Sequence, residues 1–237
     1  MRFVIIGNGV AGITAARTLS EGGATVEVYS QEAHHYYPRP RLHEFLAGEM
    51  ELEELYFYPP TWYEERGIAV HLGVEVVGLD PRAKRIALAD GRQVPYHRLL
   101  LANGSRPLIS SIEGVDKGGV FTLRTIEDAL TIKRWAREAK GAVVVGGGLL
   151  GLEAAKVLRV RGLEVTVLEL ESYLLPRQLD VEGGALLKKL IGAMGIEVAL
   201  NASSQAILGD GQATGVLLQD GRRIEGNLVL ISTGIRS

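Results

Sequence analysis

The sequence contains no cysteine. Without a thiol, these 237 residues hold no disulfide, no thiolate metal ligand, no cysteine nucleophile and no redox-active cysteine pair. Structural disulfides persist mainly in oxidising compartments. The absence therefore favours a cytoplasmic protein.

An excess of charge of either sign is also lacking. Lys and Arg total 26, Asp and Glu total 28, and the formal net charge is −2. This balance gives no support to nucleic acid or an anionic membrane surface as a partner. With 46% hydrophobic and 23% charged residues, the composition is that of an ordinary globular protein.

No apolar run is long enough to cross a membrane. The longest stretch without a charge, residues 3–16, contains three glycines and is shorter than the ~20 residues that a spanning helix needs. Met1 and Arg2 precede it, but no small-residue cleavage site follows. We therefore expect neither an export signal nor membrane association.

Glycine, by contrast, is abundant, with 30 residues, and two glycine clusters organise the chain. Each reads G-x-G-x-x-G and lies between a short β-branched run and an Ala/Leu-rich helical stretch. A second predicted strand follows each helix, at 25–29 and 165–168. The clusters are Gly7-Asn8-Gly9-Val10-Ala11-Gly12 and Gly146-Gly147-Gly148-Leu149-Leu150-Gly151.

A second pair of matching segments supports a duplication. Residues 90–92 and 220–222 both read Asp-Gly-Arg, a tight hairpin turn, and each leads into a buried strand that ends at a glycine. We predict an α/β fold of two tandem Rossmann-like units, each with a small β-meander before its final strand. The units are expected at 1–107 and 108–237, with a polar linker at 110–119.

The glycine spacing predicts dinucleotide binding in both units. The first glycine permits a tight turn, the second lets the backbone approach a pyrophosphate, and the third lets the helix pack on the strand. Amide groups and the dipole at the helix N-terminus then attract the diphosphate. The alternative is two glycine-rich turns without a ligand, which two copies in the same context disfavour.

The residue after the second strand distinguishes the two sites. Glu169 lies 18 residues after Gly151, near the ~20 expected for a carboxylate that accepts hydrogen bonds from a ribose. It would repel a 2′-phosphate, so we expect NADH rather than NADPH. The matching place in the first unit is Gln31, followed by Glu32, and either side chain could contact a ribose.

Further motifs resemble one enzyme family. Ala102-Asn103-Gly104 and Ser232-Thr233-Gly234 end two predicted strands, and Arg39-Pro40-Arg41-Leu42 follows the first unit's second strand. With the glycine clusters, they resemble the FAD- and NAD-dependent pyridine nucleotide-disulfide oxidoreductases, in the branch of the rubredoxin and ferredoxin reductases. Residues 146–153 and 175–180 are most similar to the flavin region of NADH-dependent nitrite reductases.

The resemblance implies FAD on the first unit and NADH on the second. It implies FAD contacts at Gly7, Gly9, Val10, Ala11, Gly12, Gln31, Glu32, Arg39, Val76, Ala102, Asn103, Gly104 and Arg106. It implies NADH contacts at Gly146, Gly148, Leu149, Leu150, Gly151, Glu153, Glu169 and Gly234. It also places Glu153 between flavin and nicotinamide, whereas a simpler interpretation is a carboxylate stabilised by the helix dipole. No side chain is implied as a nucleophile, and the histidines at 34, 35 and 43 form no metal-ligand pattern.

Three departures accompany the resemblance. Asn103 replaces the usual threonine, and Glu44 stands where several ferredoxin reductases have lysine, so we expect no lysine–Glu153 pair. The family's FAD-closing segment and interface domain would lie beyond Ser237. We therefore expect loose FAD binding, or a site completed by a second copy or another chain, because an unpaired strand edge recruits partners.

The expected activity is that of an FAD-dependent NADH:acceptor oxidoreductase. Its acceptor would be a rubredoxin- or ferredoxin-like protein or a small molecule, reached without an internal disulfide. The alternative is a truncated dinucleotide-binding module or subunit that is not catalytic unless a partner chain completes it.

Overall fold

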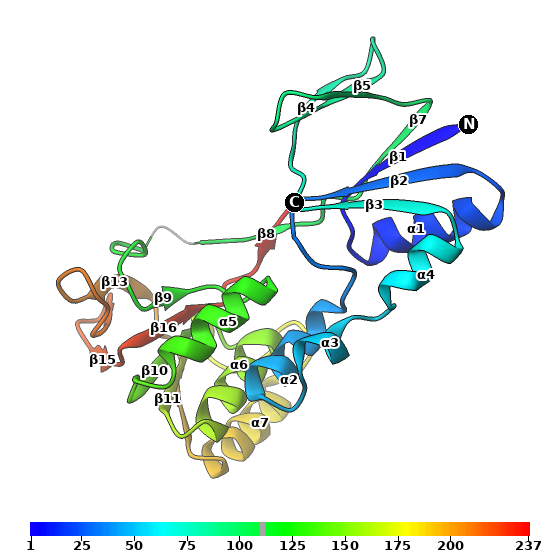
Figure 1. The fold of residues 1–237 in the computed structure, drawn as a ribbon. Coiled ribbons are helices and arrows are strands. Elements are labelled where there is room, and N and C mark those ends of the chain that lie inside the picture. The colour runs from blue at the N-terminus through cyan, green and yellow to red at the C-terminus, as the bar shows by residue number, and fades with distance from the viewer. Residues whose placement is uncertain (110–111) are drawn as a thin grey trace. The chain divides into compact units, whose positions relative to one another are not determined.

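The computed structural model describes residues 1–109 and 112–237. Residue contacts divide the chain into two compact units (Figure 1). Unit 1 comprises Met1–Arg41 and Glu51–Ser105, and unit 2 comprises Leu42–Met50 and Arg106–Ser237.

Unit 1 is built on a parallel sheet with the strand order β3-β2-β1-β7. The strands are β1 (Arg2–Ile6), β2 (Thr25–Ser30), β3 (Ile68–Leu72) and β7 (Arg98–Leu101). The strands are largely apolar because helices and a meander cover most of the sheet. Strand β7 is the exception: it was predicted to be buried, but Leu100 and Leu101 are 38% and 57% exposed. One face packs against Ile13 and Ala16 of α1 (Val10–Glu21) and Tyr63 of α4 (Pro60–Glu65).

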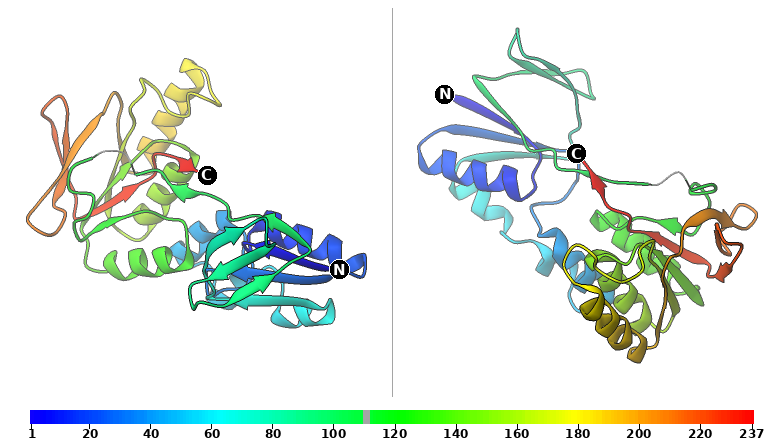
Figure 2. Two further views of the ribbon diagram at one scale, coloured as in Figure 1. Left: turned by 90° about the horizontal axis from the view of Figure 1, so that it is seen from above. Right: turned by 180° about the vertical axis from the view of Figure 1, so that it is seen from behind.

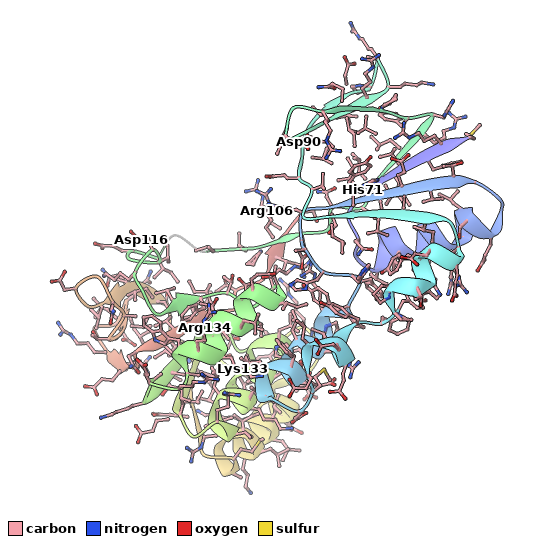
Figure 3. All side chains as sticks on the ribbon, in the orientation of Figure 1. His71, Asp90, Arg106, Asp116, Lys133 and Arg134 are labelled. Carbon is pink, nitrogen blue, oxygen red and sulfur yellow. The ribbon has the colours of Figure 1, made fainter. Side chains whose placement is uncertain are left out.

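An antiparallel meander covers the other face of this sheet. Its strands are β4 (Val76–Asp80), β5 (Arg85–Leu88) and β6 (Gln93–Pro95). Ile86, Leu88 and Val94 pack against Val4 and Tyr29 of the parallel sheet. The hairpin turn between β5 and β6 is marked by Asp90 (Figure 3).

Unit 2 repeats this plan on a five-stranded parallel sheet with the order β12-β11-β10-β16-β9. The strands are β9 (Val120–Phe121), β10 (Gly141–Val145), β11 (Glu164–Leu168), β12 (Ile196–Ala199) and β16 (Leu228–Ile231). Helices α5 (Ile126–Trp135), α6 (Leu149–Val160) and α7 (Val181–Ala193) pack with one large core cluster.

The second meander packs against a different set of core residues. Its strands are β13 (Ser204–Leu208), β14 (Gly215–Leu218) and β15 (Arg223–Glu225), which form a separate small sheet (Figure 2). Val216 and Leu218 contact Val143 and Val229 of the parallel sheet. The predicted α/β class, with two Rossmann-like units that each carry a meander, is confirmed.

The contacts differ from the sequence-based division at two places: residues 106–107 belong to unit 2, and so does the segment Leu42–Met50. Helix α2 (Leu42–Ala47) lies early in the chain but packs against α5 and α6 of unit 2. Its Phe45 and Leu46 are buried, and the Arg161 guanidinium donates to the carbonyl oxygen of Leu46 at 2.9 Å. Lys133 of α5 lies 4.8 Å from the centre of the Phe45 ring (Figure 3). The contacting residues are far apart in the sequence, so the hydrophobic pattern of short segments did not predict these contacts.

Short elements complete both units. Unit 1 also contains a 3₁₀ turn at Arg39–Arg41 and α3 (Leu52–Leu55). In unit 2, β8 (Arg106–Pro107) pairs antiparallel with β17 (Ile235–Arg236).

The stretch 110–119, expected as a linker, is packed where the structure describes it. Residues 110–111 lie outside the described residues. Ile112 is buried, and β-bridges join Glu113 to Ala206 and Gly118 to Gln212. Residues 112–119 therefore form part of unit 2. No helix in the described ranges is long and apolar enough to span a membrane.

Candidate dinucleotide sites

The turn between β1 and α1 can be made only with glycine at its first position. Gly7 has a φ of 106°, and its N–H donates to the Tyr29 carbonyl oxygen at 2.8 Å. A Cβ on Gly7 would collide with the carbonyl oxygen of Ala102, the residue that follows β7. The turn is thus packed tightly between β2 and the end of β7.

The third glycine of this motif is closely packed, whereas the second has free space beside it. A Cβ on Gly12 would collide with the Gly7 carbonyl oxygen, so the third glycine lets α1 lie directly on the turn. A Cβ on Gly9 would meet no atom within 4 Å. The second glycine therefore borders open space, as a site for a closely approaching pyrophosphate requires.

Unit 2 repeats this geometry position by position. Gly146 has a φ of 114°, and a Cβ there would collide with the Ser232 carbonyl oxygen at the end of β16. A Cβ on Gly151 would collide with the Gly146 carbonyl oxygen, whereas one on Gly148 would meet nothing within 4 Å. In both units, therefore, the first and third glycines are required by close packing of the backbone, whereas the second glycine borders open space.

The helices that follow these turns have uncapped N-termini. Gly9 and Gly148 are the N-cap residues of α1 and α6, and neither first turn holds an acidic residue. By contrast, α5 is capped by Thr125 and α7 by Asp180, whose carboxylate accepts from the Gly183 N–H at 2.8 Å. Among the described helices of ten or more residues, those on the glycine turns keep N–H groups for an outside anion.

Apolar side chains surround these helix starts without being buried. Val10 is 66% exposed, Leu149 59% and Leu150 48%, and Ala11 is exposed as well. Exposed apolar groups beside free amide donors form a surface that an amphipathic nucleotide could cover. The residues present therefore fit a dinucleotide on each turn.

Glu169 is a buried carboxylate beside the second turn. Its Oε2 accepts from the Gly147 N–H at 2.9 Å, and its Oε1 accepts from the Glu171 N–H at 3.0 Å. Each carboxylate oxygen can accept more than one hydrogen bond. The carboxylate is thus fixed next to the turn with acceptor capacity to spare.

The corresponding position in unit 1 is organised differently. The Glu32 carboxylate accepts from the Tyr37 hydroxyl and forms an ion pair with Arg39. The family resemblance implied Glu32 and Arg39 as separate FAD contacts, and the structure brings the two side chains together. Gln31 is exposed beside them.

The other predicted contacts are spread over several elements. Val76 starts β4, and Ala102, Asn103 and Gly104 follow β7, with the Ala102 N–H bonded to Ile6. In unit 2, Gly234 has a φ of 118° and precedes β17. Arg106 is exposed on β8 (Figure 3).

Comparison with known proteins identifies the family. The chain matches the pyridine nucleotide-disulphide oxidoreductase family over residues 1–237. The chain belongs to this family. The resemblance predicted from its motifs is confirmed.

Individual relatives in this family are longer than the chain. It is 35% identical to nitrite reductase (NAD(P)H) of Bacillus subtilis, over 99% of this chain and 30% of that protein. It is 36% identical to the ferredoxin–NAD(+) reductase component of the biphenyl dioxygenase system of Paraburkholderia xenovorans, over 97% of this chain and 57% of that protein. The reductase in a covalent putidaredoxin reductase–putidaredoxin complex superposes with a TM-score of 0.91 at 29% identity, over 99% of this chain and 58% of that one. The chain therefore spans less than two thirds of each relative.

This member of the pyridine nucleotide-disulphide oxidoreductases contains a histidine–carboxylate contact that sequence reasoning missed. His43 on α2 lies with its Nδ1 3.3 Å from Oε2 of Glu153 on α6. The family resemblance pointed to position 44 as the place of a partner for Glu153, but the partner is His43, one residue earlier. No local signal joins two residues so far apart in sequence.

Asn8 is a second polar residue that sequence reasoning passed over. Its side chain is buried between the first two glycines of the motif, and both amide atoms lack a hydrogen bond of good geometry. The Tyr63 hydroxyl interacts with this amide and accepts from the Tyr36 N–H at 3.1 Å. Burial raises the pKa of Tyr63. Asn8 is thus a buried polar side chain that lies close to Tyr63 of α4.

The histidines at 34 and 35 belong to an aromatic cluster. His34 Nδ1 lies 2.9 Å from the Tyr56 hydroxyl, and the His35 ring lies 4.9 Å from that of Tyr63. Burial lowers the pKa of His35. Across the described ranges, no three His, Asp or Glu side chains are grouped to hold a metal ion.

Proposed function

We propose that the chain carries the FAD- and NADH-binding units of an NADH-dependent flavin reductase. The observation that carries the proposal is the shared geometry of the two turns, in which Gly9 and Gly148 border open space at uncapped helix starts. Bound FAD would accept a hydride from NADH and pass the electrons to an acceptor. The protein's part is to bind and orient the two cofactors.

In unit 1 we assign the FAD diphosphate to the start of α1. The N–H groups around Gly9 would bind the phosphates, and Val10 and Ala11 would lie against the nucleotide. The ion pair of Glu32 and Arg39 lies after β2 and would border the adenosine ribose. Gln31, Val76, Ala102, Asn103 and Gly104 complete the proposed FAD contacts in unit 1.

In unit 2 we assign NADH to the start of α6, with its adenosine ribose at Glu169. The buried carboxylate would accept from the ribose hydroxyls while the N–H groups of Gly147 and Glu171 hold it in place. A 2′-phosphate would bring like charge against a carboxylate that cannot turn away. This favours NADH over NADPH.

The electron acceptor is proposed by analogy with relatives. These relatives include a ferredoxin–NAD(+) reductase and a reductase in a complex with putidaredoxin. A small electron-carrier protein of the ferredoxin or rubredoxin kind is therefore our first candidate, with a small-molecule acceptor as the alternative. Association with a second copy or with another chain stays a prediction.

The second candidate function is a dinucleotide-binding module or subunit that becomes catalytic only with a partner chain. It is proposed because the chain spans only 30% of one relative and 57% of another. The two are separated by adding FAD to the purified chain, removing free flavin and adding NADH without air. Bound yellow flavin that NADH bleaches supports the reductase, and NADH binding without flavin reduction supports the module. Failure to bind either nucleotide contradicts both.

A further inference from the structure

His43 and Glu153 meet on the outer side of α6. The Nδ1–Oε2 distance is 3.3 Å, the His43 side chain is 11% exposed, and the Glu153 side chain is 46% exposed. Because a carboxylate accepts hydrogen bonds, the contact favours imidazole with a proton on Nδ1. In either charge state of the ring, part of the Glu153 charge is then engaged by His43.

The order of the sheet shows on which side of α6 this pair lies. Strand β10 leads into α6, with β11 on one side and β16 on the other. Helix α5 lies on the β16 side, since Trp135 contacts Phe121 of β9 with ring centres 5.7 Å apart. Helix α2, which carries His43, packs against both α5 and α6. The pair therefore lies on the β16 side of α6.

A dinucleotide bound to this turn would have its two halves on opposite sides of β10. Glu169 follows β11, so the adenosine half belongs on the β11 side. The nicotinamide half then belongs on the β16 side, with the His43–Glu153 pair. This step rests on the NADH site proposed for unit 2.

We propose that the His43–Glu153 pair discriminates between the oxidised and the reduced nicotinamide ring. The oxidised ring carries a positive charge, and the reduced ring carries none. An unengaged Glu153 carboxylate would attract the oxidised ring, and His43 weakens that attraction by engaging the carboxylate. The consequence is weaker binding of NAD⁺, the product of NADH oxidation.

The test compares three ligands on the FAD-loaded chain by titration calorimetry. They are NAD⁺, 1,4,5,6-tetrahydro-NAD, whose ring is uncharged and transfers no hydride, and ADP-ribose, which has no nicotinamide. At a surface-like dielectric and physiological salt, we expect His43→Phe to tighten the binding of NAD⁺ by about threefold to tenfold relative to tetrahydro-NAD. ADP-ribose affinity should stay within about twofold, since it lacks the charged ring.

A double-mutant cycle isolates the pair. Glu153→Gln should weaken the binding of NAD⁺ relative to tetrahydro-NAD. Adding His43→Phe to Glu153→Gln should change this ratio less than His43→Phe does in the unmodified protein, because His43 acts through the Glu153 carboxylate. Matched controls are Glu164→Gln, at the start of β11, and His97→Phe in unit 1, and both should leave the ratio unchanged. If His43→Phe fails to fold, His43→Gln replaces it, and ¹⁵N NMR of the unmodified protein should show a proton on Nδ1 of His43.

The outcomes are distinct. Equal changes for all three ligands, an unchanged ratio, additive effects in the cycle or an unprotonated Nδ1 would each overturn the proposal while leaving the NADH site intact. If the unmodified chain binds none of the three ligands, the NADH site in unit 2 is refuted and the proposal falls with it.

Discussion

The backbone N–H of Gly147 donates a 2.9 Å hydrogen bond to the carboxylate of Glu169. The bond joins the glycine turn after β10 to the residue after β11, two segments that a dinucleotide would contact together. A Cβ on Gly147 would lie 2.8 Å from this carboxylate and 2.7 Å from Leu174. The turn and the carboxylate therefore hold each other in place before any ligand arrives.

This arrangement predicts that Glu169 sets the choice of nucleotide. Glu169→Gln keeps a side-chain acceptor for Gly147 but removes the charge that would oppose a 2′-phosphate. Like charges near 4 Å repel by about 4 kcal/mol at a surface-like dielectric, so even a screened fraction gives a clear preference for NADH. The ratio of NADH to NADPH dissociation constants should move toward one in Glu169→Gln, and Glu164→Gln should not change it. Equal affinities in the unmodified protein would contradict the assignment.

The second and third glycines of the unit 1 motif, Gly9 and Gly12, should respond differently to alanine. Gly12→Ala places a methyl group against the Gly7 carbonyl oxygen, so the free energy of unfolding should fall by about 1–3 kcal/mol or more. Gly9→Ala meets no protein atom, so the fold should persist while FAD binding weakens. Urea unfolding and flavin titration measure the two effects. Equal loss of stability in both variants would show that Gly9 is not an open position.

The position of α2 should depend on Arg161. Its guanidinium donates to the carbonyl oxygens of Leu46 and Ala47 at 2.9 and 3.4 Å. Arg161→Met removes both hydrogen bonds, and hydrogen bonds to charged groups contribute about 1.5–3 kcal/mol. Amide hydrogen exchange in α2 should accelerate, whereas exchange in α7 should be unchanged. Unaltered exchange at Phe45 and Leu46 would show that apolar packing alone holds the helix.

Tyr29 should make stability fall at high pH. Burial, helped by its hydrogen bond to Glu27, raises the pKa of Tyr29 to about 12 from the usual 10. A group whose pKa is raised on folding adds stability below its unfolded pKa and loses it as pH rises through the folded value. The unmodified protein should therefore lose about 2–3 kcal/mol from this group between about pH 10 and 12. The stability difference from Tyr29→Phe should narrow over that range, and phenolate absorbance should show the late titration.

The central strands of both parallel sheets and the glycine turns follow from local sequence. Short β-branched runs form strands, and the steric demands at Gly7 and Gly12 recur at Gly146 and Gly151 because the same spacing produces the same turn. The Asp-Gly-Arg hairpins lie at the expected places in both meanders, with φ of 87° at Gly91 and 88° at Gly221. Local rules suffice for these features, since each depends on residues close together in the chain.

Contacts between distant segments were decided only by the tertiary structure. Sequence alone determined that Glu153 lies near the start of a helix, but its partner His43 comes from a segment that the sequence placed with the first unit. Likewise Glu32 and Arg39 could be named as binding residues, but not as an ion pair. Strand and helix periodicity specify which face of an element is buried, whereas the neighbour that covers it depends on how the whole chain packs.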